Sequence, residues 1–387
     1  GATIFYGQKA SNIISGIDVV VYTAAIHPDN EEFAEAVKQN LPMLTRAELL
    51  GQLMTNYDVP IAISGTHGKT TTTSMLSHIL LAGELDPTIS VGGILKAIGG
   101  NIRVGNSEYF VTEACEYTNS FLHFFPKIGV ILNIDEDHLD FFKDLADIRN
   151  SFHRFAKLLP KDGTLVINDN IPDLEEITAD LDCRVIRYGN DSSLDYSATN
   201  ILHDKKGEAS FDLVKSGEFI DRISLSVNGD HNVSNALSAI AVADLLGVPF
   251  TKIKEGLKSF HGTDRRFEYK GEVNGVTVID DYAHHPTELK ATLSAAKKLK
   301  KSTLWCVFQP HTYSRTKSLF NEFGEAFYAA DKVIITDIYA AREDDPGDIH
   351  SKDLAEKLYH NNVDVKYISK FEDIVDYLKE NIKPNDL

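Results

Sequence analysis

One segment restricts the fold of this chain more than any other. Residues 61 to 73 combine an apolar strand, a glycine turn and the start of a helix, in the order Ile61-Ala62-Ile63-Ser64-Gly65-Thr66-His67-Gly68-Lys69-Thr70-Thr71-Thr72-Thr73. Glycines let backbone amides approach phosphate oxygens, and the amino end of a helix favours negative charge. The pattern predicts a nucleotide loop in which Lys69 reaches the β and γ phosphates and Thr70 ligates Mg²⁺. The residues expected to contact the nucleotide are Gly65, Thr66, His67, Gly68, Lys69, Thr70 and Thr71.

This loop is shorter than the common phosphate-binding loop. The common pattern has a glycine five residues before Gly68, and that position is Ile63 here. A strand-to-helix turn with an incidental lysine is the alternative interpretation. The strand before the loop, the helix after it and the four threonines favour nucleotide binding.

Apolar strand-like runs alternate with stretches of helical periodicity along the chain. Such alternation predicts an α/β fold with mostly parallel sheets. The stretch from Asp204 to Asn228 instead alternates polar and apolar residues around two glycines, which predicts antiparallel hairpins at a sheet edge. Strands are expected at 17–22, 60–63, 128–133, 276–279, 303–308 and 332–336, and helices at 231–246 and 251–260.

A chain of 387 residues has room for more than one core. Changes in pattern near 56–59 and 262–264 predict three segments, 1–57, 58–262 and 263–387. The run from Ile17 to Tyr22 is typical of a buried strand, yet no strand and helix precede it. We therefore expect the natural chain to start upstream of residue 1.

Composition excludes several classes of function. The net charge of −18 provides no field that would attract a polyanion, which argues against nucleic-acid binding. No apolar run approaches the roughly 20 residues that a membrane helix requires, so no membrane partner is expected. The three cysteines, Cys115, Cys183 and Cys306, are far apart and odd in number, which predicts a reducing, cytoplasmic location.

Six further motifs follow the loop, and together they make the chain resemble the Mur ligase superfamily over nearly its whole length. The motifs are Glu113-Ala114-Cys115-Glu116-Tyr117 with Ser120-Phe121, Asn133-Ile134-Asp135-Glu136-Asp137-His138-Leu139-Asp140, Asp230-His231-Asn232-Val233-Ser234-Asn235-Ala236, Arg265-Arg266-Phe267-Glu268, Asp280-Asp281-Tyr282-Ala283-His284-His285-Pro286-Thr287-Glu288 and Phe308-Gln309-Pro310-His311. The family begins with a glycine-rich strand and turn and ends with a further strand. Neither is present here, so the resemblance implies a chain truncated at both ends.

The resemblance implies a three-domain enzyme. Residues 1–57 would form a partial UDP-sugar-binding Rossmann-like domain, 58–262 a central P-loop ATP-binding domain, and 263–387 a Rossmann-like domain that binds the amino acid. The implied reaction is an ATP-dependent carbon–nitrogen ligation through an acyl phosphate, in peptidoglycan synthesis. The motif strings are most similar to the branch that joins L-alanine to the lactyl carboxylate of UDP-N-acetylmuramate, as a monomer or homodimer. Relatives that add later residues usually carry a carbamoylated lysine where this chain has Ser151-Phe152-His153.

Glu113 and His138 each follow a predicted buried strand, where side chains project at the carboxyl edge of a parallel sheet. Taken singly, both could be ordinary polar residues at strand ends. The resemblance implies that they are metal ligands, with Thr70, for Mg²⁺, and Mn²⁺ would also suit the site. Glu116 is expected beside them, as a supporting group or a contact to the substrate.

Asn232 and Asn235 open a predicted helix, where capping alone would account for them. The resemblance implies that Asn235 contacts adenine and that Asn232 belongs to the same nucleotide site. It further implies that Arg265 or Arg266 reaches the phosphates, of which we choose Arg266, and that Asp281 accepts hydrogen bonds from the ribose hydroxyls.

The last segment is expected to supply groups for the amino acid. Arg315 has a planar fork that matches a carboxylate and could hold that of alanine, while His284 could orient or deprotonate the amine. Some relatives carry a second arginine where Thr312 stands. The full catalytic set predicted for the chain is Lys69, Glu113, His138, His284 and Arg315.

Three alternatives remain open at the level of sequence. One is another amide ligase of the same superfamily, such as a peptide-recycling ligase, a folylpolyglutamate synthase or a cyanophycin synthetase. The second is a non-catalytic ATP-binding protein that uses the nucleotide as a conformational switch. The third is a fragment that binds ATP without turnover.

Overall fold

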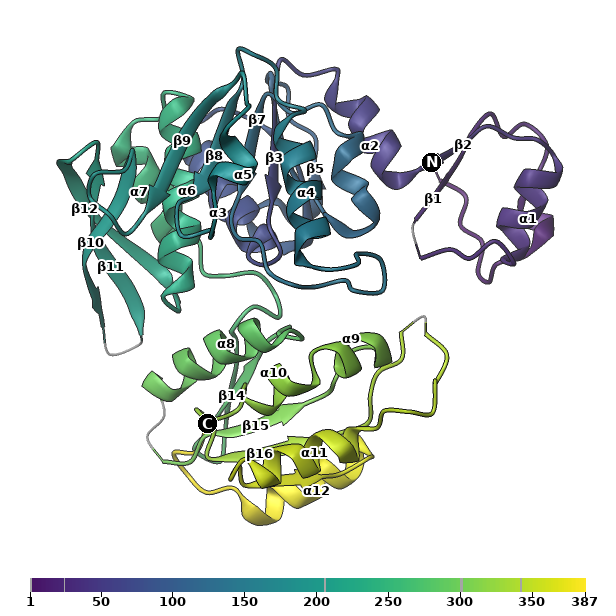
Figure 1. Ribbon diagram of the computed structural model, residues 1–387, viewed down its shortest axis with the longest axis vertical. Coiled ribbons are helices and arrows are strands. Elements are labelled where there is room, and N and C mark those ends of the chain that lie inside the picture. The colour runs from purple at the N-terminus through teal and green to yellow at the C-terminus, as the bar shows by residue number, and fades with distance from the viewer. Residues whose placement is uncertain (1, 24, 205–206, 300–301, 342) are drawn as a thin grey trace.

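The computed structural model describes residues 2–23, 25–204, 207–299, 302–341 and 343–387. Figure 1 shows a small amino-terminal unit beside a large central unit, with the carboxyl-terminal unit below the central one. Helices and mostly parallel strands alternate throughout, which confirms the predicted α/β class.

The amino-terminal unit contains a two-stranded parallel sheet, β1 (Val20–Tyr22) and β2 (Met43–Thr45), with helix α1 (Glu31–Lys38) between them. The prediction of a buried strand here was wrong. Val19 and Val21 are more than 40% exposed, because a sheet of two strands has little to cover its faces. Helix α2 (Arg46–Met54) then leads to the central unit and begins with a capping box between Thr45 and Glu48.

The central unit is built on one sheet of ten strands, in the order β12-β11-β10-β9-β8-β7-β3-β6-β4-β5. Strands β3, β4 and β6 to β10 pair in parallel, while β5, β11 and β12 join in antiparallel fashion at the two edges. The β11–β12 hairpin confirms the predicted hairpin before Asn228. The bounds are β3 (Val59–Ser64), β4 (Thr88–Leu95), β5 (Gly100–Arg103), β6 (Tyr109–Glu113), β7 (Ile128–Ile131), β8 (Thr164–Asn168), β9 (Arg184–Gly189), β10 (Tyr196–His203), β11 (Glu208–Lys215) and β12 (Glu218–Asn228).

Helices cover both faces of this sheet. Ile61 and Ile63 of β3 point into one hydrophobic core and Ala62 into the other, since side chains alternate along a strand. A continuous apolar strand is therefore what a parallel sheet buried on both faces requires. The first core is covered by α3 (Lys69–Ala82), α6 (His231–Leu245) and α7 (Phe250–Ser259), and the second by α2, α4 (Leu145–Ala156), α5 (Glu175–Thr178) and η3 (Tyr117–His123).

The carboxyl-terminal unit has an antiparallel hairpin and a three-stranded parallel sheet with its own core. The hairpin consists of β13 (Glu268–Val273) and β14 (Val276–Asp280), and the sheet of β15 (Trp305–Phe308), β16 (Lys332–Ile335) and β17 (Val365–Tyr367). The helices are α8 (Pro286–Leu299), α9 (Tyr313–Ser318), α10 (Phe320–Gly324), α11 (Ser351–His360) and α12 (Phe371–Asn381).

The strand order decides where the site forms. Strands β7, β3 and β6 are neighbours and run in parallel, so the segments after them meet at one edge of the sheet. Figure 1 places the carboxyl-terminal unit, with α8, opposite the central unit. None of the helices described in the structure is long and apolar enough to cross a membrane.

Candidate active site

The predicted phosphate loop connects β3 to α3 and depends on two glycines. Gly65 has φ +142° and Gly68 has φ +84°, and both values are unfavourable for a residue with a Cβ atom. A Cβ on Gly68 would also lie 2.7 Å from Oδ1 of Asn235. The loop is held from the next strand, because Asn133 accepts from the His67 amide at 2.7 Å and donates to the His67 carbonyl at 3.0 Å. The backbone thus presents the start of α3 to a ligand.

Lys69 is tethered within this loop. Its Nζ donates to the Glu116 carboxylate at 2.9 Å and to the Thr66 carbonyl at 3.1 Å. Only 2% of the Glu116 side chain is exposed. Burial opposes the charge on Lys69, but the Glu116 carboxylate, together with Cys115 and Glu113, raises the pKa of the lysine above its ordinary value. Glu116 therefore holds a charged lysine at the start of α3.

Thr70 and Glu113 lie side by side beneath the loop. The Thr70 hydroxyl donates to Oε2 of Glu113 at 3.1 Å, and the Gly92 amide donates to its Oε1. A hydroxyl and a carboxylate fit Mg²⁺, which takes one or two protein oxygens and completes its shell with phosphate and water oxygens. Among the described residues, no three His, Cys, Asp or Glu side chains converge as a metal-binding group. Glu113 and His138 are thus not assembled with a third ligand of that kind.

His138 lies on the other side of Glu116. Its Nε2 is 3.8 Å from Oε1 of Glu116, and its ring packs on Tyr117 with centroids 4.5 Å apart. His138 has φ +54°, a left-handed conformation that is uncommon for a residue with a side chain. Burial lowers the pKa of His138 despite the nearby carboxylates of Asp137 and Glu116. The imidazole is therefore neutral at physiological pH, as a metal ligand must be.

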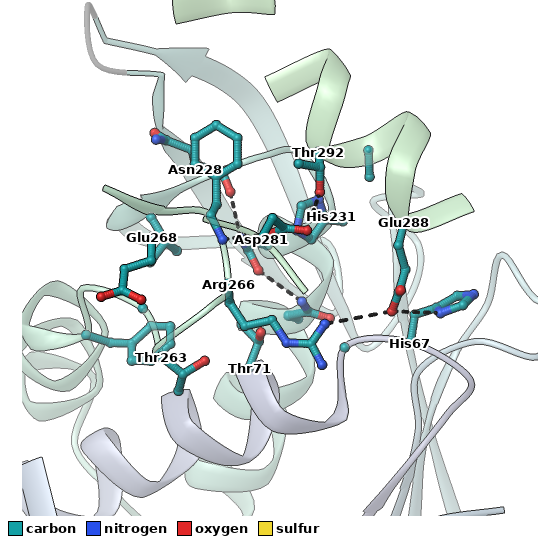
Figure 2. Close-up of a pocket in the computed structure, with 18 of the residues that line it drawn as sticks. His67, Thr71, Asn228, His231, Thr263, Arg266, Glu268, Asp281, Glu288 and Thr292 are labelled. Atoms are coloured by element: carbon teal, nitrogen blue, oxygen red, sulfur yellow. Dashed lines mark hydrogen bonds and ion pairs between the residues drawn. The ribbon is translucent and has the colours of Figure 1, made fainter. Parts of the chain in front are cut away.

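A cavity of about 480 Å³ extends from the phosphate loop toward the carboxyl-terminal unit, and its size suits a nucleotide. Figure 2 shows side chains from both units around it. The predicted nucleotide residues that line it are His67, Gly68, Thr71, Asn232, Asn235, Arg266 and Asp281. The structure therefore brings together, at one cavity, predicted residues that are separated by more than 200 positions in the sequence.

Two of the polar groups that line this cavity already have protein partners. Asn235 donates to Oδ1 of Asn232 at 3.0 Å. Asp281 accepts from the Phe267 amide at 2.7 Å and from the Thr292 hydroxyl at 2.9 Å. A carboxylate has about four acceptor positions, so Asp281 retains capacity for a further donor.

A second pocket of about 160 Å³ lies between the two units and brings together three predicted catalytic residues, His138, His284 and Arg315. Nδ1 of His284 is 2.8 Å from the Tyr282 carbonyl, which orients the ring. Arg315 is not free in this structure. Its Nε donates to Oδ1 of Asp137 at 3.0 Å, and its Nη2 forms an ion pair with the same oxygen at 3.0 Å, across the boundary between the units.

Sequence reasoning missed the ionic contacts that join the two units. His67 lies between Oδ2 of Asp135 at 3.2 Å and Oε1 of Glu288 at 3.3 Å, and Arg315 pairs with Asp137. No local signal marks these pairs, because their members are distant in the sequence. Asp135, Asp137 and Glu288 do lie within the quoted motifs, which marks them as candidate site residues but does not indicate their partners.

We expect His67 to stay protonated well above neutral pH. Burial opposes its charge, but the Asp135 and Glu288 carboxylates raise the pKa of His67 from 6.5 to about 9. Protonation therefore favours the folded state. The stabilisation is fully present below pH 6.5 and disappears as the pH rises through about 9. The free energy of unfolding of the wild type minus that of His67→Gln, measured from pH 6 to 10, should shrink over this range. A ring that titrates at or below 6.5 by NMR would contradict the assignment.

Comparison with known families gives three matches along the chain. Residues 1–58 match the family described as Mur ligase family, catalytic domain, residues 63–243 match the Mur ligase middle domain, and residues 265–387 match the Mur ligase, glutamate ligase domain. The UDP-N-acetylmuramate–L-alanine ligase of Lachnospira eligens is 58% identical, over 100% of this chain and 84% of the relative. The ligase of the same name from Clostridium tetani is 53% identical, with the same coverage.

Solved structures have the same architecture. The UDP-N-acetylmuramate-alanine ligase MurC of Thermotoga maritima matches with a TM-score of 0.80 and 27% identity, over 98% of this chain and 82% of that one. A murein peptide ligase from Psychrobacter arcticus matches with a TM-score of 0.74 and 26% identity, over 99% and 84%. MurF of Thermotoga maritima, solved in complex with ADP, has a TM-score of 0.71 at 18% identity, over 95% and 89%, which is a likeness of fold.

Proposed function

The chain belongs to the Mur ligase family, and on that premise we infer that it joins L-alanine to UDP-N-acetylmuramate at the expense of ATP. The observation that carries this function is the 58% identity to the Lachnospira eligens ligase over the whole chain. The geometry supports it, because a phosphate loop, a nucleotide-sized cavity and a second small pocket lie along one boundary between two units.

The reaction has two steps. An oxygen of the lactyl carboxylate attacks the γ-phosphorus of ATP, so that a new P–O bond forms as the bond to the β-phosphate oxygen breaks, which yields an acyl phosphate and ADP. The amine of alanine then attacks the carbonyl carbon, the C–O bond to phosphate breaks, and the amine loses a proton. The products are the amide and inorganic phosphate.

We assign the first step to the residues around the loop. Phosphoryl transfer depends mainly on positioning and on neutralising charge. Lys69 exchanges its Glu116 contact for phosphate oxygens, while the amides at the start of α3 add their dipole. Thr70 and Glu113 would hold Mg²⁺ or Mn²⁺, which supplies positive charge when it is bound, and His138 would serve as a further ligand. Asn232, Asn235, Arg266 and Asp281 complete the nucleotide site.

We assign the second step to the smaller pocket. Arg315 would bind the carboxylate of alanine once it is released from Asp137 or shared with it, and His284 would orient or deprotonate the amine. The residues assigned to ATP and those of the smaller pocket come from both the central and the carboxyl-terminal unit. Closure of these two units would therefore exclude water from the acyl phosphate. The proposed domains are 1–57, 58–262 and 263–387. The proposed location is the cytoplasm, where ATP is available and the three free cysteines would stay reduced.

Glu113→Gln should raise the Mg²⁺ concentration needed for half-maximal activity by at least about ten-fold, because an amide oxygen replaces a charged ligand. Activity measured against total Mg²⁺ at saturating ATP tests this. Glu108→Gln, beside the opposite end of β6, is the matched control and should leave the requirement unchanged. An unchanged requirement in Glu113→Gln would remove this residue from the metal site.

The function itself is tested by phosphate release from ATP and Mg²⁺ with UDP-N-acetylmuramate, as single amino acids are scanned. Release should require both UDP-N-acetylmuramate and L-alanine, and should disappear in Lys69→Ala. Release with a tripeptide instead of alanine would favour a peptide-recycling ligase. ATP binding without any acceptor-dependent release would favour the nucleotide switch.

A further inference from the structure

Glu288 lies where the two units meet and is only 14% exposed. It is the third residue of α8, and its Oε2 accepts from the amides of His284 and His285 at 3.0 and 3.4 Å. This is one half of a capping box, in which a glutamate folds back to the residue before its helix. One oxygen of Glu288 therefore fixes the backbone that carries His284, the residue assigned to the amine.

The other oxygen of Glu288 crosses to the central unit. Oε1 is 3.3 Å from Nδ1 of His67, and Figure 2 shows the Glu288 side chain pointing toward that ring. His67 belongs to the phosphate loop, and Asn133 holds its backbone at both the amide and the carbonyl. A single carboxylate thus joins the loop that binds phosphate to the segment that approaches the amine.

Both partners carry charge in this arrangement. Burial would raise the pKa of Glu288, but His67, with His284 and Arg266 nearby, holds it well below its ordinary value. Separating a buried pair of opposite charges is costly, because each charge is then left uncompensated. The contact can therefore select one relative placement of the two units.

We propose that His67 and Glu288 form an interdomain latch that positions His284 against the phosphate loop. They are positioning residues that touch neither the reacting carboxylate nor the amine, and their role rests on the ligase function proposed above. The latch couples the two half-sites, since displacement of the loop is transmitted through Glu288 to the backbone of His284.

A purely structural role for Glu288 is the alternative, because the same side chain caps α8. Glu288→Gln separates the two roles. The amide oxygen of glutamine still accepts from the His284 amide, whereas the charged contacts to His67, to the His284 ring at 3.4 Å and to Arg266 at 3.8 Å are lost. Only the part of the effect that depends on His67 belongs to the latch, and the double-mutant cycle below isolates it. If capping were the whole role, Glu288→Gln would be nearly silent and its effect would be independent of His67.

The experiment is a double-mutant cycle on the full chain, with His67→Gln, Glu288→Gln and the double variant. Each single variant should lower kcat about ten-fold or more, because small displacements at a reacting centre are costly. In Glu288→Gln the KM for ATP should change by less than about three-fold, since Glu288 is not among the assigned nucleotide contacts. The double variant should lose no more than the more damaged single variant, as expected for two halves of one contact. Losses that multiply in the double variant, or a Glu288→Gln enzyme with wild-type kcat, would overturn the latch.

Lys298→Gln is the matched control. Lys298 lies on the same helix and bridges the same two units through Asp230 at 3.1 Å, but this pair is exposed and away from the pockets. It should leave kcat unchanged. Small-angle X-ray scattering on the same proteins gives a readout that does not need turnover, and both latch variants should show a larger radius of gyration than the wild type and Lys298→Gln. A wild type without alanine-dependent release would refute the proposed function, whereas unchanged scattering in the latch variants would refute the latch.

Discussion

Lys69→Ala is expected to lower the rate of acceptor-dependent phosphate release by about a thousand-fold, the scale on which loss of one preorganised charge donor reduces catalysis. Lys69 is the residue of the loop that we assign to the phosphates, and Glu116 already orients it at 2.9 Å. Water that replaces the ammonium group cannot supply a fixed charge. Single-turnover phosphate release at saturating ATP measures the effect on the chemical step.

The same substitution also removes the partner of a buried carboxylate. Glu116 is 2% exposed, so Lys69→Ala should destabilise the fold by up to about 3–5 kcal/mol through the uncompensated charge. The double variant Lys69→Ala, Glu116→Gln should recover much of that stability without recovering activity. Denaturant unfolding of the three proteins separates the two effects. Activity of Lys69→Ala within ten-fold of the wild type would contradict the assigned role.

Gly68→Ala is expected to reduce kcat/KM for ATP by about a hundred-fold, because it disturbs the loop in two ways. The φ of +84° costs an L-residue roughly 1–2 kcal/mol. In addition, the new Cβ would lie 2.7 Å from Oδ1 of Asn235, so that either the loop or Asn235 must move. Steady-state kinetics with ATP as the varied substrate measure the loss.

Gly217→Ala is the control that has the same backbone conformation without the steric clash. Gly217 has φ +85°, nearly the same conformation, but no atom lies within 4 Å of its added Cβ. It connects β11 to β12, away from the loop. This control should lose stability through the backbone conformation alone and keep its affinity for ATP. A kinetic loss in Gly217→Ala as large as that in Gly68→Ala would show that the effect is not specific to the loop.

Local elements followed from local sequence with small errors. The strand expected at 60–63 spans Val59–Ser64, and the helix expected at 251–260 spans Phe250–Ser259. Hydrophobic periodicity and the positions of glycines are patterns over a few residues. The strand, glycine turn and helix of residues 61–73 could therefore be predicted from the sequence. The strand expected at 17–22 is shorter and half exposed, because burial depends on what covers a strand and not on its own residues.

In the site, too, the individual residues could be predicted from the sequence and their contacts could not. The loop, the paired asparagines and the strand-end residues Glu113 and His138 were identified as candidates from the sequence, and their roles remain proposals. What the sequence did not contain was their partners. Glu116 as the tether of Lys69 depends on the neighbouring positions of β3 and β6 in the sheet.

The sequence by itself determined the α/β class, the phosphate loop and the family, because each is carried by residues that are close together in the chain. Only the tertiary structure decided that Glu288 lies against His67 and that Asp137 forms an ion pair with Arg315. These contacts join residues 221 and 178 positions apart. They form only when two separately packed cores are placed against each other, and short-range patterns carry no information about that placement.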